Sequence, residues 1–317
     1  MGPGRTGGRR MIDKLEMLIA LAREQHFGRA AAACHVTQPT LSSAIKSLED
    51  QLGATLVNRG PRYLGLTDEG ERVLARARII VAEARALRAD LAAARSRPGG
   101  VLRLGVIPTA LIEARLYTAP FLAEHPGVRL RLCSMTSHQI LAALADFEID
   151  AGLSYAQTDL THDRLSGIEA LPLYDEHYAL LTPVAPGLPA RLTWADLAGR
   201  DLGLLTPDMQ NRRIIDQHLA AAEVTLLPRV ESNSILTLVG LVQTGRIATV
   251  LPERIARFFA QVPGLACLPI ADAAAPGARA TVALILPPQG RRSALLDIFV
   301  RRAMLIDKAN GGTETAI

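Results

Sequence analysis

Short hydrogen-bonding side chains and one cation gather at the start of a helical segment that follows Thr37. The Thr37 hydroxyl can cap this helix by accepting from a free backbone N–H, and a proline in the first turn is harmless there. Hydroxyl, amide and ammonium groups at a helix N-terminus can contact base edges in the major groove of DNA and nearby phosphates. The residues predicted to make such contacts are Gln38, Pro39, Thr40, Ser42, Ser43 and Lys46.

The elements around this segment are typical of a small helical DNA-reading module. Residues 11–25 form a predicted amphipathic helix, and residues 29–33 form a second short helix that breaks around Cys34. The third helix has one apolar stripe with helical spacing, made of Leu41, Ile45, Leu48 and Leu52. The polar side chains are therefore expected on the opposite, exposed side; an ordinary solvated helix surface is the alternative interpretation.

Two short predicted strands, residues 55–58 and 63–66, flank the tetrapeptide Arg59-Gly60-Pro61-Arg62. A Gly-Pro pair is typical of a tight turn, so the segment is predicted to be a hairpin with arginines at its tip. A hairpin in this place is the wing of a winged helix-turn-helix, and Arg59 and Arg62 are expected to contact the DNA backbone or the minor groove. A plain surface turn is the alternative.

A long uninterrupted helix is predicted for residues 67–97. Thr67 can cap it, acidic residues suit its N-terminus, and no proline occurs before Pro98. Apolar residues at alternating spacings of three and four define a heptad seam, which predicts pairing with a second copy of the chain. The alternative is packing of this seam against the chain's own C-terminal part. The predicted dimerisation residues are Val73, Ala77, Ile80, Ala84, Leu87 and Leu91.

The remaining two-thirds of the chain alternates predicted strands and helices, which indicates a mostly parallel sheet covered by helices. The pattern restarts once, and two α/β lobes joined by crossing strands account for its length. The predicted divisions of the chain are a disordered extension (1–10, with Met11 as a second candidate start), a DNA-binding domain (11–66), a linker helix (67–97), a hinge (98–100), a two-lobed domain (101–306; lobe I 101–171 and 268–306, lobe II 172–267) and a flexible tail (307–317).

Polar residues stand where predicted strands of this domain meet helix N-termini, which is where open α/β sheets bind ligands. Thr109, Thr136 and Ser137 open predicted helices, and Asn211 and Arg212 lie in a polar loop that opens another. Free N–H groups together with an arginine favour a small anion. These five residues are the predicted effector contacts; the alternative is that the hydroxyls only cap helices and the arginine is solvated.

The basic charge lies at the N-terminal end. Residues 1–66 carry a net charge of +4, residues 67–97 of +2 and the rest of −2. This asymmetry favours a polyanion-binding module joined to a nearly neutral domain. With 4% aromatic residues, recognition by base stacking, as in single-strand binders, is not expected.

The sequence lacks the residue patterns of several functional classes of protein. The three cysteines, Cys34, Cys133 and Cys267, lie far apart and form no metal-ligand spacing, so no metal, disulfide framework or cofactor is expected. Motifs of nucleophilic, nucleotide-binding and zinc enzymes are missing. Without a secretory signal or an apolar stretch of about 20 residues, a cytoplasmic protein with no membrane partner is expected.

The run from Phe27 to Leu56 (FGRAAAACHVTQPTLSSAIKSLEDQLGATL), followed by Leu66-Thr67-Asp68-Glu69-Gly70, resembles the N-terminal module of LysR-type transcriptional regulators. Downstream, Gly105-Val106-Ile107-Pro108-Thr109 and Val242-Gln243-Thr244-Gly245 leading to Leu251-Pro252 continue the resemblance. It implies a winged helix-turn-helix, a dimerising linker helix and a two-lobed effector domain like type II periplasmic binding proteins.

The resemblance implies a function and partners as well. Family members assemble as dimers or dimers of dimers on double-stranded promoter DNA, and a small-molecule inducer, here a small organic anion, changes the bend of that DNA. RNA polymerase is a further implied partner. A regulator that senses an oxoanion such as molybdate through a different domain type is the alternative.

Several residues depart from the family pattern, among them Arg246 and Ala248, which break a usual Gly-x-Gly segment. Ser43 stands where relatives often have arginine, and Phe147 stands where a helix-ending glycine is usual. The peroxide-sensing branch of the family needs a reactive cysteine pair in the second lobe. Because only Cys267 lies there, a peroxide-sensing mechanism is not expected.

Overall fold

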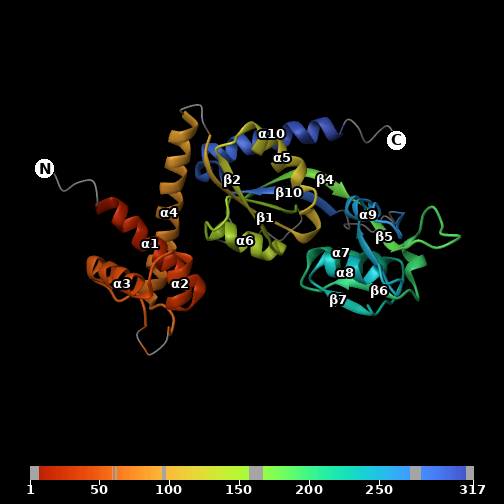
Figure 1. Cartoon of the computed structure of the whole chain (residues 1–317), viewed down its shortest axis with the longest axis horizontal. Helices are drawn as coiled ribbons and strands as arrows, with labels where there is room; N and C mark the ends of the chain where they lie inside the picture. The colour runs from red at the N-terminus through yellow and green to blue at the C-terminus, as the bar shows by residue number, and fades with distance from the viewer. Residues whose placement is uncertain are drawn as a thin grey trace. The chain divides into compact units, whose positions relative to one another are not determined.

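The computed structural model describes residues 7–58, 60, 63–94, 98–156, 167–271 and 280–311. The chain divides into two compact units, Met1–Ala94 and Arg95–Ile317 (Figure 1). Among the described residues, no helix is both long and apolar enough to span a bilayer. The predicted hinge is narrower than expected, because Gly100 already belongs to the first strand of the second unit.

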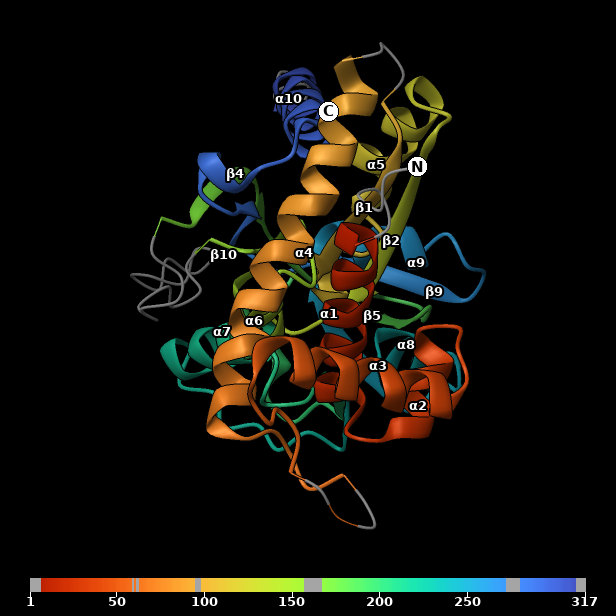
Figure 2. The same cartoon turned by 90° about the vertical axis from the view of Figure 1, so that its left-hand side faces the viewer.

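The first unit is helical, with the element order α1 (Gly7–Glu24), α2 (Phe27–Ala33), α3 (Gln38–Leu52) and α4 (Asp68–Ala94). Figure 2 shows α1, α2 and α3 as a compact group beside the lower part of α4. Helix α1 begins at Gly7, so residues 7–10 are helical and the prediction of a disordered extension up to residue 10 is wrong for them.

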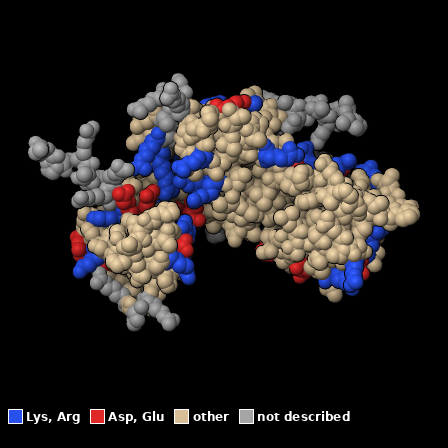
Figure 3. Space-filling model, in the orientation of Figure 1, with Lys and Arg blue, Asp and Glu red and all other residues tan. Residues whose placement is uncertain are grey.

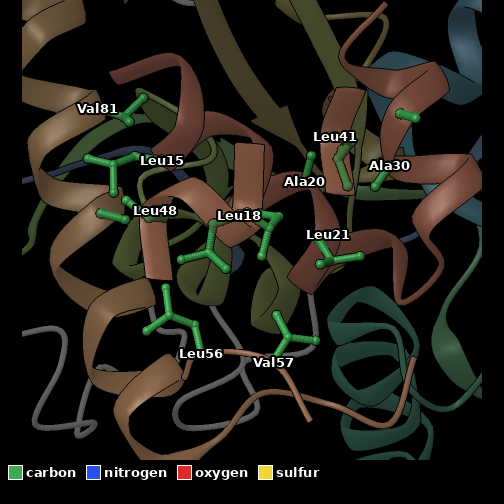
Figure 4. Packing of buried hydrophobic residues seen from close by; sticks show 13 residues of the cluster. Leu15, Leu18, Ala20, Leu21, Ala30, Leu41, Leu48, Leu56, Val57 and Val81 are labelled. Atoms are coloured by element: carbon green, nitrogen blue, oxygen red, sulfur yellow. The ribbon is translucent and has the colours of Figure 1, made fainter. Parts of the chain in front are cut away.

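Apolar side chains from all four helices close a single core in this unit. Leu15, Leu18 and Leu21 of α1 recur along one face and pack with Leu41 and Leu48 of α3 (Figure 4). Ala77 and Val81 of α4 complete the cluster. Helical periodicity predicted the buried stripe of α3 from Leu41 to Leu48, but Leu52, the last residue of that predicted stripe, is 41% exposed.

Side-chain caps fix where helices α2 and α3 begin. His26 caps α2, because its Nδ1 accepts hydrogen bonds from Gly28 N at 3.0 Å and Arg29 N at 3.3 Å. Thr37 caps α3 by accepting from Thr40 N at 3.4 Å, as predicted from the sequence. Gly53 ends α3 in the left-handed region at φ +66°, which suits a residue without a side chain.

The second unit holds two five-stranded sheets, and each is the centre of one lobe. In lobe I the strand order is β2-β1-β3-β10-β4, with parallel pairing from β2 to β3 and antiparallel pairing around β10. Helices α5 and α10 lie on one face of this sheet and α6 on the other (Figure 1). The elements are β1 (Gly100–Val106), η1 (Pro108–Ala110), α5 (Ala114–Glu124), β2 (Val128–Ser134), α6 (Ser137–Ala145), β3 (Ala151–Tyr155), β4 (Glu169–Glu176), β10 (Ala280–Leu286), η4 (Gln289–Arg291) and α10 (Ala294–Gly311).

Lobe II has the strand order β7-β6-β8-β5-β9, with β5 antiparallel to both neighbours. Helices α8 and α9 contribute to an apolar core that includes Leu238, Val242 and Ile255. The elements are β5 (Tyr178–Pro183), η3 (Trp194–Leu197), β6 (Leu202–Leu205), α7 (Gln210–Ala221), β7 (Val230–Ser232), α8 (Ile235–Val242), β8 (Ala248–Pro252), α9 (Glu253–Phe259) and β9 (Leu265–Pro269).

Three boundaries differ from the predicted ones. Strand β4 stays in the first sheet up to Glu176 and β9 stays in the second up to Pro269. The chain therefore passes from one lobe to the other a few residues later than predicted at both crossings. Hydrogen bonding along a whole strand decides this boundary, and composition does not reveal it. Helix α10 continues to Gly311, so the first five residues of the predicted flexible tail, 307–311, are helical.

Candidate DNA-binding face and ligand pockets

The exposed side of α3 carries every side chain predicted to contact DNA from this helix. Its opposite side is buried through Leu41, Ile45 and Leu48, so packing fixes which side faces outward. Where α3 lies, the surface seen in Figure 3 is mostly uncharged, with Lys and Arg near its margins. The exposed residues are Gln38, Pro39, Thr40, Ser42, Ser43 and Lys46.

One of these side chains is already engaged within the helix. The hydroxyls of Thr37 and Thr40 lie 2.8 Å apart and share a hydrogen bond at the N-terminus of α3. Ser47, one position after Lys46, accepts a hydrogen bond from Lys14 Nζ at 2.8 Å, which ties α3 to α1. Hydrogen bonds therefore hold the first turn and the middle of α3 in place, while the other amide and hydroxyl groups on its outer side remain exposed.

Glu49 was missed by the sequence reasoning, although it positions the end of α3. It is only 7% exposed, and its Oε1 accepts from the backbone N–H groups of Leu56 at 2.8 Å and Val57 at 3.2 Å. This carboxylate ties α3 to the segment that leads into the predicted wing. A signal was available, because Glu49 comes four residues after the buried Ile45 and therefore lies on the same side of α3.

The wing is described only in part. Val57 and Leu66 form an isolated antiparallel bridge, and Asn58 Nδ2 donates to Leu66 O at 2.8 Å. The two predicted strands are thus reduced to one bridge. The predicted contacts Arg59 and Arg62 lie outside the described residues.

The predicted seam of α4 divides into a buried half and an exposed half. Ala77 is 1% exposed and the half-buried Val73 packs against the core of the first unit, so these two residues offer little apolar surface to a second copy. Helix α1 covers this part of α4 instead. Further along, Ala84 is half-buried, whereas the large side chains are exposed to 47%, 61% and 54% for Ile80, Leu87 and Leu91.

In the second unit, four of the five predicted effector residues line one narrow pocket, whose free volume of about 10 Å³ is close to that of a single water. Tyr155, at the end of β3, also lines it, and the cavity is named the Tyr155 pocket here. Lobe I contributes η1 and the start of α6, and lobe II contributes the start of α7. The predicted residues that it brings together are Thr109, Thr136, Ser137 and Asn211.

A chain of hydrogen bonds crosses this pocket from one lobe to the other. The Tyr155 hydroxyl lies 3.2 Å from Thr109 Oγ1 and accepts from Asn211 Nδ2 at 3.3 Å. Asn211 is 2% exposed, and its Oδ1 is buried without a hydrogen-bond partner among the described residues. The buried Ser137 accepts from Ser154 Oγ at 3.0 Å, while Thr136 caps α6. The pocket is therefore polar and holds an unused acceptor.

Arg212 does not face this pocket as a free cation. Its Nε donates to Asp216 Oδ1 at 2.8 Å, and its Nη1 donates to Glu231 Oε1 at 2.6 Å and to Leu205 O at 2.9 Å. Burial lowers the pKa of Arg212, but the hydrogen bonds to the two carboxylates outweigh burial and raise it. Arg212 also does not line the Tyr155 pocket, and its pairing with two carboxylates weakens the case for its predicted role in holding an anionic effector.

Glu176, which the sequence reasoning did not single out, lies behind the Tyr155 pocket. Its Oε2 accepts from the Tyr155 hydroxyl at 2.8 Å. Burial raises its pKa to about 8, against the lowering effects of this hydrogen bond and of Arg254. Burial, and secondly the charge of Glu176, raise the pKa of Tyr155 well above its usual range. At neutral pH this pair carries little charge.

The three cysteines are free. Burial raises the pKa of Cys267 to about 11 and also raises the pKa of Cys34, so neither thiol is activated as a thiolate. Among the described residues, no group of three or more His, Cys, Asp and Glu side chains could hold a metal ion.

Two family models match the chain. The bacterial regulatory helix-turn-helix protein model of the lysR family covers residues 12–71, and the LysR substrate binding domain model covers residues 95–304. The chain belongs to the LysR family of transcriptional regulators. These proteins bind DNA through the helix-turn-helix, and their C-terminal domain receives effectors. The alternative, an oxoanion-responsive regulator with a different domain type, is wrong, because both the DNA-binding and the C-terminal part match LysR family models.

Similar proteins agree with this assignment over nearly the whole length. A protein of Pectobacterium carotovorum subsp. carotovorum named hydrogen peroxide-inducible genes activator is 30% identical over 295 residues, which is 90% of this chain and 94% of the relative. A variant of full-length OxyR from Pseudomonas aeruginosa has a TM-score of 0.65 at 27% identity and covers 93% of this chain and 94% of its own. Full-length CbnR in complex with its target DNA, at 22% identity, shares the fold with a TM-score of 0.66 over 93% of this chain and 99% of its own.

Proposed function

We propose that this LysR-type regulator binds a two-fold symmetric promoter site in the cytoplasm as a homodimer, with α3 of each copy in a major groove. The exposed amide, hydroxyl and ammonium groups at the start of α3 suit contacts with base edges and phosphates. In this proposal Arg59 and Arg62 contact the DNA beside α3. The dimers pair into tetramers on DNA and contact RNA polymerase, as the family resemblance implies.

The exposed part of the α4 seam supplies the dimer contact in this proposal. Ile80, Leu87 and Leu91 are large apolar side chains that an isolated helix leaves in water. Together with Ala84 they follow one another at spacings of four, three and four, which is the pattern of a coiled-coil seam. Val73 and Ala77 take no part, because they belong to the core of the chain itself.

The effector of this regulator is a small polar molecule held in the Tyr155 pocket. Thr109, Thr136 and Ser137 offer hydroxyls, and the start of α7 offers backbone N–H groups and the unused Oδ1 of Asn211. A ligand with both donors and acceptors fits this set better than a simple anion, since Arg212 is already neutralised. The feature that still favours an organic anion is the N-terminus of α7, where backbone N–H groups can donate to it.

One observation carries the effector proposal: the hydrogen bond from Asn211 of lobe II to Tyr155 of lobe I crosses the pocket. A ligand that replaces this bond changes how the two lobes close, and the change alters the bend of bound DNA. Footprinting on DNA upstream of the regulator's own gene, with and without a library of small polar metabolites, tests this step. A ligand that binds the protein while the footprint length stays constant contradicts it.

Response to hydrogen peroxide is a second candidate, because the Pectobacterium relative carries that name. The chain's own thiols argue against a thiolate-based sensor, since burial raises the pKa of Cys267 to about 11. Peroxide treatment of the wild type and of Cys267→Ser, followed by mass spectrometry and footprinting, separates the two candidates. A peroxide-dependent footprint that disappears in Cys267→Ser selects the peroxide sensor.

A further inference from the structure

A second pocket lies beside Glu176, the hydrogen-bond partner of Tyr155, and its volume of about 430 Å³ is far larger than the roughly 10 Å³ of the Tyr155 pocket. Both lobes build it: the end of β4 and the start of α5 come from lobe I, and the start of α9 comes from lobe II. Because Glu176 lies in its wall, it is named the Glu176 pocket here. Thr109 lines both cavities.

The charged groups around the Glu176 pocket are mostly paired with one another. Arg254 Nη1 lies 3.5 Å from Glu113 Oε2, and its guanidinium lies 4.7 Å from the centre of the Tyr174 ring. Arg257 and Glu253 form an ion pair within α9. Arg257 is thus matched within α9, whereas Arg254 acts on two carboxylates, since it lies beside Glu113 and its charge also lowers the pKa of Glu176.

Glu176 is the acidic side chain of the wall with an unused buried oxygen. It is 8% exposed, its Oε2 is used by Tyr155, and its Oε1 has no hydrogen-bond partner among the described residues. A buried acceptor without a partner is rare in folded proteins, because its water is lost and nothing replaces it. The neighbouring Asp175, in contrast, accepts from Thr281 Oγ1 at 2.6 Å.

We propose that the Glu176 pocket binds a small organic cation, a primary ammonium with a short apolar body, whose N–H groups donate to Glu176. With Glu176 ionised, the wall carries four carboxylates and two guanidinium groups, so it favours a cation over an anion. Leu116, Pro252 and Ile255 provide an apolar surface for the body of the ligand. A metal ion fits less well, since no ligand cluster for one occurs among the described residues.

This site connects to the Tyr155 pocket through a single hydroxyl. Glu176 Oε2 is 2.8 Å from Tyr155 Oη, and Tyr155 Oη contacts Thr109 and Asn211 on its other side. A charge fixed on Glu176 holds the Tyr155 proton toward Glu176, so Tyr155 then presents an acceptor to the first pocket. Binding of the cation does not depend on the proposed effector site; only the coupling between the two pockets does.

Proton release gives this site its own signature. Glu176, with a pKa raised to about 8 by burial, is mostly protonated at pH 7, and binding an ammonium requires the ionised carboxylate. The other charged or titratable groups around it are Glu113, Asp175, His177 and Arg254. We expect binding at pH 7 to release up to one proton, and binding at pH 9 to release almost none.

Isothermal titration of the full-length protein with n-butylammonium chloride tests the site. We expect saturable binding with one site per chain, no binding of butyrate or n-butanol, and heats at pH 7 that differ between phosphate and Tris buffers. Glu176→Gln keeps the shape and the neutral state of the side chain and should weaken binding by about tenfold or more. The matched control is Glu169→Gln at the exposed end of the same strand, which should bind like the wild type.

Three results would overturn the proposal. These are no saturable heat with butylammonium, equal binding of butyrate, or equal affinity of Glu176→Gln and wild type. If Glu176→Gln does not fold, the buffer dependence of the wild-type heats decides, because binding without proton release at pH 7 contradicts a role for Glu176. A failed effect of butylammonium on DNA footprints, with binding intact, removes only the coupling to the Tyr155 pocket.

Discussion

Replacing Glu49 by alanine tests how the DNA-binding unit is held together. The side chain is 7% exposed, and its Oε1 accepts from two buried backbone N–H groups, those of Leu56 and Val57. Glu49→Ala leaves both donors without a partner. Because each unsatisfied buried group costs about 1–3 kcal/mol, we expect the free energy of unfolding of this unit to fall by about 2–5 kcal/mol.

Urea unfolding of the full-length protein, followed by far-UV circular dichroism, measures this loss. Asp50→Ala is the matched control, because Asp50 is the next residue of α3 but is exposed, and its effect should stay within about 0.5 kcal/mol. We also expect Glu49→Ala to weaken binding to all DNA sequences, since the segment leading to the wing loses its anchor. Equal stability of the two variants would refute the role given to Glu49.

Three further predictions address other parts of the molecule. A Cβ at Gly70 would clash with the backbone oxygen of Leu56, so Gly70→Ala should destabilise the protein by about 1–3 kcal/mol in thermal unfolding. Gly240→Ala, with open space around it in α8, should instead stabilise the protein by up to about 1 kcal/mol. Leu87→Asp should turn the dimer into a monomer in sedimentation velocity runs, and Arg88→Ala beside it should not. The pKa of Glu176 is about 8 in the folded protein and exceeds its unfolded value, so wild-type stability should fall as the pH rises from about 5 to 8. Urea titrations of Glu176→Gln should show a smaller fall over this range. An equal dependence of stability on pH in the variant and the wild type would contradict the raised pKa.

The sequence predicted those features that local periodicity and capping determine. The stripe from Leu41 to Leu48 and the cap at Thr37 together specify the side of α3 that faces outward. The alternation of strands and helices predicted an α/β domain of two lobes. The gathering of Thr109 and Asn211 at one pocket also followed, because strand ends and helix N-termini meet at the same edge of a sheet.

Features set by contacts between distant residues were not predictable in this way. Of the two carboxylates that pair with Arg212, that of Asp216 is four residues away in the sequence and that of Glu231 is 19 residues away. The α4 seam looks continuous in the sequence, although α1 buries its first half. Phe147 adopts a left-handed φ of +57°, where glycine is usual, and the Arg291 guanidinium lies 3.9 Å from the centre of its ring.

The central claim is that the exposed start of α3 reads DNA sequence, and one comparison tests it most directly. Gln38→Ala and Gln51→Ala remove the same exposed side chain from opposite ends of α3. In competition titrations with upstream DNA and a scrambled duplex, Gln38→Ala should lose about 1–3 kcal/mol on the specific site only, and Gln51→Ala should lose almost nothing. Equal losses for both variants, or a loss for Gln38→Ala that is the same on both duplexes, would contradict base reading by α3.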